Sequence, residues 1–197
     1  MTSINSKNKY RRMKNYFFLI ATSMIVSVCF LISRSNENYD QQVELQPKSN
    51  IKGDSTLPQE LFNLNYAEKI MGEPMHLTDS TVKHEGGVLS YLSGYKANSE
   101  DKKIGRTGAI YFLFEQFDQI ASAHDKYAST KTANEHNGIQ TLDNLGDEAY
   151  FHTDGEHFYF IMVRKGGKVF NIKVNKITNT TSLKEFNAVA KKIVANI

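Results

Sequence analysis

The sequence predicts an α+β fold: an antiparallel β-sheet meander flanked by helices, with an N-terminal transmembrane or signal-anchor helix. Three observations support this class. Apolar runs between residues 138 and 175 end at Gly146-Asp147, Asp154-Gly155 and Gly166-Gly167, and such dipeptides supply the positive φ of hairpin turns. Residues 182–197 repeat apolar side chains at helical spacing. An uncharged apolar run lies near the first residue.

Charge is distributed unevenly along the chain. It carries 24 basic and 21 acidic side chains, but residues 1–34 hold six of the basic and none of the acidic ones. The remainder therefore has 18 basic against 21 acidic side chains and is mildly acidic. Nucleic-acid-binding domains present a basic face to the phosphates, so we expect no nucleic-acid partner.

The N-terminal region has two parts. Residues 1–15 form a basic arm, and residues 16–32 are uncharged and mostly apolar. As a helix, these 17 residues would span roughly 25 Å, the short end of what crosses a bilayer. Basic flanks stay on the cytoplasmic side. We therefore expect the bacterial cytoplasmic membrane as a partner, a single pass, and a C-terminal domain that is periplasmic or extracellular.

The maturation of this segment is open between three outcomes. No small-x-small cleavage site follows the apolar core, which favours an uncleaved signal anchor over secretory cleavage. Cys29, the single cysteine, ends Val26-Ser27-Val28-Cys29, which resembles a bacterial lipobox but departs from it at Val28. A lipoprotein with its lipid on Cys29 is therefore the alternative. One cysteine also excludes an internal disulfide.

Residues 33–58 are rich in Ser, Asn, Gln and charge and have few apolar side chains, so they predict a flexible tether. Residues 59–197 predict one extracytoplasmic α+β domain. At 139 residues it is long enough for one core.

Three helices are predicted in this domain. The first spans Tyr66 to Met71, with Asn65 as its N-cap and Gly72 as its stop signal. The last begins at Ser182, which forms a capping box with Glu185. The middle helix spans 118–132, and its expected apolar stripe consists of Phe117, Ile120, Ala121, His124 and Ala128. His124 is expected to be a core or boundary residue.

The hairpin around Asp154-Gly155 gives a parity prediction. With those two residues as the turn, His152 faces His157 and Tyr150 faces Tyr159. Strand 157–164 then carries apolar side chains on both faces and is expected to be central. The strand at 169–175 alternates apolar with polar residues and is expected at or near an edge. The Gly166-Gly167 loop before it could hold two or three residues.

Enzyme signatures are scarce. The sequence has no glycine-rich phosphate loop, no paired-cysteine motif and no Gly-x-Ser-x-Gly elbow. The candidate metal ligands are His152 and His157, with Asp154 or Glu156 as an oxygen donor, although hairpin tips are usually polar because they are solvated. We therefore expect a protein without catalytic activity and without a cofactor.

Three short motifs carry a resemblance to known proteins. They are Asn-Tyr-Ala-Glu-Lys-Ile-Met-Gly-Glu-Pro at 65–74, Leu-Gly-Asp-Glu-Ala-Tyr-Phe at 145–151 and Val-Arg-Lys-Gly at 163–166. With them the chain resembles small exported bacterial domains: actinobacterial cell-wall lipoproteins of unknown function and the extracellular sensor domain of mycobacterial serine/threonine kinases. Their fold is similar to that of the extrinsic photosystem II oxygen-evolving proteins. The resemblance implies a binding or sensing role, although this chain lacks the cysteine pair of many such lipoproteins.

These observations favour a membrane-tethered, extracytoplasmic, non-catalytic binding or accessory module of the bacterial cell envelope. Its partner would be an envelope protein or a small ligand. One alternative is a structural subunit of an envelope assembly that pairs through the strand at 169–175, expected to be an edge. The other is a metal-dependent hydrolase built on His152 and His157.

Overall fold

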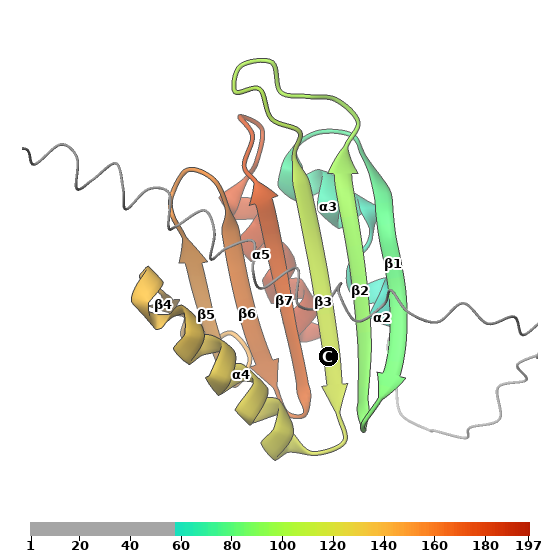
Figure 1. The fold of residues 1–197 in the computed structure, drawn as a ribbon, viewed down its shortest axis with the longest axis vertical. Coiled ribbons are helices and arrows are strands. Elements are labelled where there is room, and N and C mark those ends of the chain that lie inside the picture. The colour runs from blue at the N-terminus through green and yellow to red at the C-terminus, as the bar shows by residue number, and fades with distance from the viewer. Residues whose placement is uncertain (1–57) are drawn as a thin grey trace, which may run out of the picture. The chain divides into compact units, whose positions relative to one another are not determined.

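The computed structural model describes residues 58–197 (Figure 1). The predicted basic arm, membrane segment, Cys29 and tether up to residue 57 lie outside the described residues. From residue 58 onward, no helix is both long and apolar enough to cross a bilayer.

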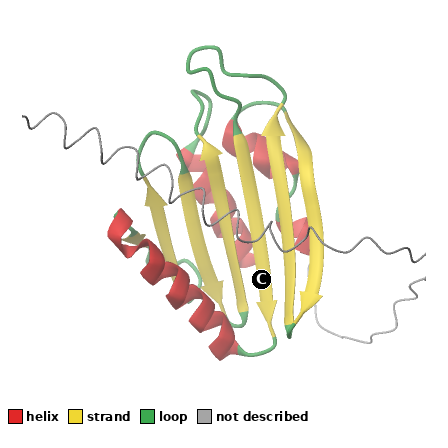
Figure 2. Cartoon of the chain, in the orientation of Figure 1, coloured by secondary structure: helices red, strands yellow, loops and turns green. Residues whose placement is uncertain are grey.

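Seven antiparallel strands form one sheet in the order β1-β2-β3-β7-β6-β5-β4 (Figure 2). Together with the helices, this sheet confirms the α+β class. The strands are β1 (Met75–Glu85), β2 (Val88–Ala97), β3 (Ala109–Phe117), β4 (Gln140–Thr141), β5 (Glu148–Thr153), β6 (Tyr159–Lys165) and β7 (Lys168–Lys176).

Helices lie on both faces of the sheet. In Figure 1, α3 and α5 pack behind the sheet, and α4 crosses one corner of its front face. The helices are α2 (Pro58–Leu61), α3 (Leu64–Met71), α4 (Ile120–Asn134), the short 3₁₀ helix η1 (Glu135–Asn137) and α5 (Leu183–Ala195).

Local sequence signals explain where these helices begin and end. The Ser182 side chain accepts a 3.2 Å hydrogen bond from the Glu185 amide, as predicted for the start of α5. Gly72 ends α3 with φ of 69°. The N-cap of α3, however, is Asn63 and not Asn65: the Asn63 side chain accepts from the Tyr66 amide at 3.2 Å.

The main core lies between the sheet and the pair α3 and α5. Phe62 stacks on Phe112 with ring centroids 5.1 Å apart, and Phe112 contacts Phe170 at 6.1 Å. Phe186 and Ile193 of α5 are buried in the same cluster. A smaller cluster lies beneath α4 on the front face and comprises Ala123, Tyr127, Tyr150, Met162 and Val169. Strand β6 is therefore covered on both faces, as predicted.

The β6–β7 loop has two residues, because Lys165 pairs directly with Lys168. Strand β7 is hydrogen-bonded to β3 on one side and to β6 on the other. The prediction that 169–175 is an edge strand is therefore wrong. Its alternation of apolar with polar residues has another cause: Asn171 and Lys173 lie on the front face, which α4 covers only in part.

The position of the middle helix was predicted to within two residues, but its apolar stripe was not. Ala123 and Tyr127 are the buried residues of α4, while Ile120 is 64% exposed. Alanines lie on more than one face of this helix, so the sequence allowed an apolar stripe through Ala121 or one through Ala123. The buried stripe contains Tyr127, whose ring has the larger apolar surface to remove from water.

The register of the β5–β6 hairpin also differs from the prediction. His152 pairs with Phe160 and Thr153 with Tyr159, so that His152 does not face His157. The Asp154 carboxylate accepts hydrogen bonds from the amides of Glu156 at 3.1 Å and His157 at 2.8 Å. It thereby stabilises a turn of five residues, 154–158, in place of the predicted two. Because the difference is odd, every side chain of the second strand moves to the opposite face.

Candidate functional site

The predicted histidine pair is not assembled as a metal site. His157 Nδ1 lies 2.7 Å from Asp154 Oδ2, at the tip of the hairpin. His152 packs on Phe158 with ring centroids 4.9 Å apart. Within residues 58–197, no three side chains of His, Cys, Asp or Glu are grouped so that they could hold a metal ion.

His152 lies in an apolar environment. Its Nδ1 is buried and makes no hydrogen bond within the described residues. Burial lowers the pKa of His152 and outweighs the nearby Asp154 carboxylate. The ring is therefore neutral at physiological pH. His124, expected at the core or its boundary, is exposed on α4, with its Nε2 3.9 Å from Glu148.

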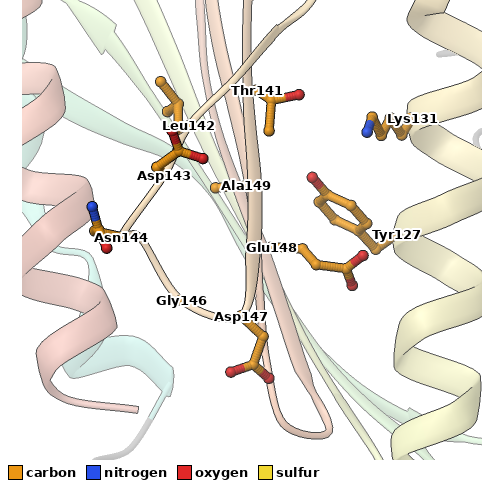
Figure 3. Close-up of a pocket in the computed structure, with 10 residues that line it drawn as sticks. All are labelled: Tyr127, Lys131, Thr141, Leu142, Asp143, Asn144, Gly146, Asp147, Glu148 and Ala149. Atoms are coloured by element: carbon orange, nitrogen blue, oxygen red, sulfur yellow. The ribbon is translucent and has the colours of Figure 1, made fainter.

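A polar pocket lies between α4 and the chain before β5 (Figure 3). Tyr127 and Lys131 approach it from α4, and Thr141 and Glu148 from the sheet. Burial raises the pKa of Tyr127 to about 12, so its phenol keeps its proton at neutral pH.

The two carboxylates at one end of the pocket both form ion pairs with Arg164. Its Nη1 lies 2.9 Å from Asp147, and its Nε lies 2.5 Å from Glu148. Asp147 also accepts the Gly166 amide at 2.7 Å. Gly146 contributes as well, because a Cβ there would lie 2.5 Å from the Arg164 carbonyl oxygen. The Gly146-Asp147-Glu148 segment is thus a structural junction that holds the loop before β5 against the β6–β7 turn.

The front face contains a second candidate, a row of four side chains across adjacent strands. Tyr111 of β3 pairs with Lys173 of β7, Lys173 with Phe160 of β6, and Phe160 with His152 of β5. We name these four residues the front row. Figure 1 shows α4 over one corner of this face, whereas α3 and α5 lie behind the sheet.

Lys173 is the charged member of the front row and belongs to the central strand of the sheet. Its side chain is half-buried between the strands that carry Tyr111 and Phe160. Among residues 58–197, no carboxylate forms an ion pair with its ammonium. Burial lowers the pKa of Lys173. Sequence reasoning missed this residue, because the alternating pattern alone places it on a solvated face.

Tyr111 owes its position to a glycine on the neighbouring strand. Tyr111 pairs with Gly94 of β2, and a Cβ at Gly94 would lie 3.1 Å from two carbons of the Tyr111 ring. The ring therefore lies against the backbone of β2, with 38% of the residue exposed. This arrangement gives the front row a partly exposed aromatic ring, which lies toward β2.

Comparisons with known proteins give no match: no family model, no curated protein and no solved structure is similar to this chain. The class that the coordinates define is an α+β domain built on a seven-stranded antiparallel sheet. Its function must therefore be inferred from its own residues.

Proposed function

We propose that this chain is a membrane-tethered, extracytoplasmic, non-catalytic binding or accessory module of the bacterial cell envelope, and that its front row binds an anionic ligand. The observation that carries the binding role is the half-buried Lys173 ammonium, which has no carboxylate partner within residues 58–197.

The energetic argument starts from desolvation. An ammonium that is partly removed from water loses hydration, and a nearby anion restores the lost interaction. A carboxylate or phosphate on Lys173 would form a charge-assisted hydrogen bond. The rings of Tyr111 and Phe160 on the adjoining strands offer apolar surface to the rest of the ligand. The ligand class is thus an anion that carries a planar or apolar group.

The tethered location has separate support. It depends on the uncharged run at 16–32, the basic arm before it and the polar segment at 33–58. The resemblance to small exported bacterial domains favours the same location and a binding or sensing role. A C-terminal reporter fusion tests it: periplasmic or extracellular reporter activity is expected, and activity confined to the cytosol would exclude the tethered topology.

Isothermal titration with phenylacetate and phenyl phosphate tests the binding role, with the purified full chain in detergent. We expect binding by the parent chain and at least a tenfold weaker affinity in Lys173→Met, which keeps the aliphatic stem. Lys96→Met is the matched control, because Lys96 is an exposed lysine of β2 on the same face. Absence of heat with the parent, or equal weakening in both variants, would count against the proposal.

The metal-dependent hydrolase is a second proposal with its own test. It would require His152 and His157 to approach each other, whereas in this structure His152 is paired with Phe160. Titration of zinc into the parent and into His152→Ala tests its first requirement: heat that disappears in the variant would establish a metal site at His152, and no heat would exclude it.

A further inference from the structure

Strand β1 leaves one edge of the sheet open. It is the outermost strand, with 11 residues, and among the strands of residues 58–197 it pairs with β2 alone. Ten of its residues are exposed or half-buried, including Leu77 at 52% and Val82 at 50%. The outer backbone amides and carbonyls of such a strand can pair with another strand.

Self-pairing of β1 is restricted by symmetry. Two copies of one chain pair side by side about a two-fold axis perpendicular to the sheet, which keeps equivalent faces on the same side. Directly opposite residues must then project to the same face. One residue of β1 therefore lies opposite the same residue of the other copy, with the axis between them. The candidates near the middle of the strand are residues 79, 80, 81 and 82.

The charges of β1 distinguish these registers. An axis at residue 79 places Asp79 opposite Asp79, and an axis at residue 82 places Asp79 opposite Glu85. Both are repulsive, because like charges directly opposite destabilise a strand pair. An axis at residue 80 leaves Asp79 opposite a neutral threonine. An axis at Thr81 places Asp79 opposite Lys83 twice, once in each direction.

We propose that β1 pairs with β1 of a second copy of this chain in an antiparallel register centred on Thr81, with Asp79 of each copy opposite Lys83 of the other. The two sheets then form one continuous sheet of 14 strands, twice the seven of one copy. This inference concerns a different surface from the front row and does not depend on the ligand proposed there.

The features that usually protect an edge strand are consistent with this register. The bulge between Leu77 and Asp79 interrupts regular pairing at one end, so the regular part of the partner interface is residues 79–83. Val82 of the two copies become diagonal neighbours on the other face, which covers part of an exposed apolar side chain. Charge and bulge thus act against other partners and other registers.

Sedimentation of the purified full chain in detergent, over a range of concentrations, tests the interface. We expect a dimer for the parent and at least a tenfold weaker dimer for Asp79→Lys and for Lys83→Asp. The double variant Asp79→Lys/Lys83→Asp should recover the parent affinity. An equimolar mixture of the two single variants should also dimerise, because each then presents the opposite charge to the other.

Rescue cannot come from within one chain, since residues four apart on a strand lie about 13 Å apart. Circular dichroism confirms that the variants fold. A monomeric parent overturns the proposal. A dimer that neither single variant weakens lies at another surface and overturns it too, as does a double variant that stays as weak as the singles.

Cysteine cross-linking in intact membranes provides a second measurement. Thr81→Cys should form a disulfide-linked dimer under mild oxidation, above the level of the parent, whose single cysteine is Cys29. His84→Cys is the matched control, because its two copies would lie about 20 Å apart in this register. Equal cross-linking at both positions, or none at Thr81→Cys, contradicts the register.

Discussion

The Lys165 ammonium donates a 2.9 Å hydrogen bond to the carbonyl oxygen of Val194, and so joins the end of β6 to the last turn of α5. It donates a second, of 2.7 Å, to the carbonyl oxygen of Ile197. The last carbonyls of a helix lack intrahelical partners, and a cation there also interacts favourably with the helix dipole.

Lys165→Met should therefore lower the free energy of unfolding by about 1–3 kcal/mol, the usual range for hydrogen bonds to a charged group. Urea denaturation followed by circular dichroism measures the effect. Lys191→Met is the control, since Lys191 is an exposed lysine on the same helix. Equal losses in the two variants would show that the contact with α5 contributes nothing.

Gly72→Ala should destabilise the protein more than Gly155→Ala. Both glycines have positive φ, 69° and 82°, so both variants carry the left-handed strain of about 1–2 kcal/mol. A Cβ at Gly72 would also collide with the carbonyl oxygen of Thr180, whereas a Cβ at Gly155 has nothing within 4 Å. The difference between the two urea midpoints isolates the steric contact, and similar midpoints would contradict it.

Stability should fall as the pH drops below about 6.5, the ordinary pKa of histidine. Burial lowers the pKa of His152 in the folded state, so between the two pKa values the unfolded chain binds more protons. His152 contributes its full stabilisation above pH 6.5, and the contribution is lost as the pH falls through its lowered folded pKa.

His152→Phe keeps a planar ring and should flatten this slope when urea midpoints are compared between pH 7 and pH 5. His84→Phe, at an exposed position on β1, should keep the parent slope.

Asp154 acts at lower pH: burial opposes its ionisation, but hydrogen bonds from His157 and Glu156 hold its pKa below the ordinary value of 3.8.

Lys173→Met should not lower the free energy of unfolding at neutral pH. Burial lowers the pKa of Lys173, which means that the folded state disfavours its charged form. Replacing the ammonium with a methylthio group removes that penalty and keeps an unbranched side chain of similar length. Thermal unfolding without ligand is the measurement, and a loss above about 1 kcal/mol, a typical destabilisation by a point mutation, would contradict the expectation.

The sequence predicted features that depend on neighbouring residues. Ser182 caps α5, Gly72 ends α3, and the Gly166-Gly167 turn lies between β6 and β7. It could not give the position of β7, because alternating polarity looks the same at a sheet edge and on a partly covered central strand. Lys173 was missed for the same reason.

The turn at Asp154 shows a second limit. Asp-Gly is typical of a two-residue hairpin, but here the Asp154 carboxylate binds two amides further along and lengthens the loop. The turn has five residues (154–158) in place of two, and this odd difference moves Phe160 to the face of His152. The front row is created by that shift, so it could not be predicted while the two-residue turn was assumed.

The strand that joins the two halves of the sheet is also the last one to be synthesised. Strand β3 pairs with β7, and Phe114 and its partner Phe170 lie 56 residues apart in the sequence. Until residues 168–176 are in place, β1 to β3 and β4 to β6 are separate units, and β3 and β6 each have one unpaired edge. Closure of so long a loop is slow and leaves those edges open to misassociation, so we expect the pairing of β7 to be a late step in folding.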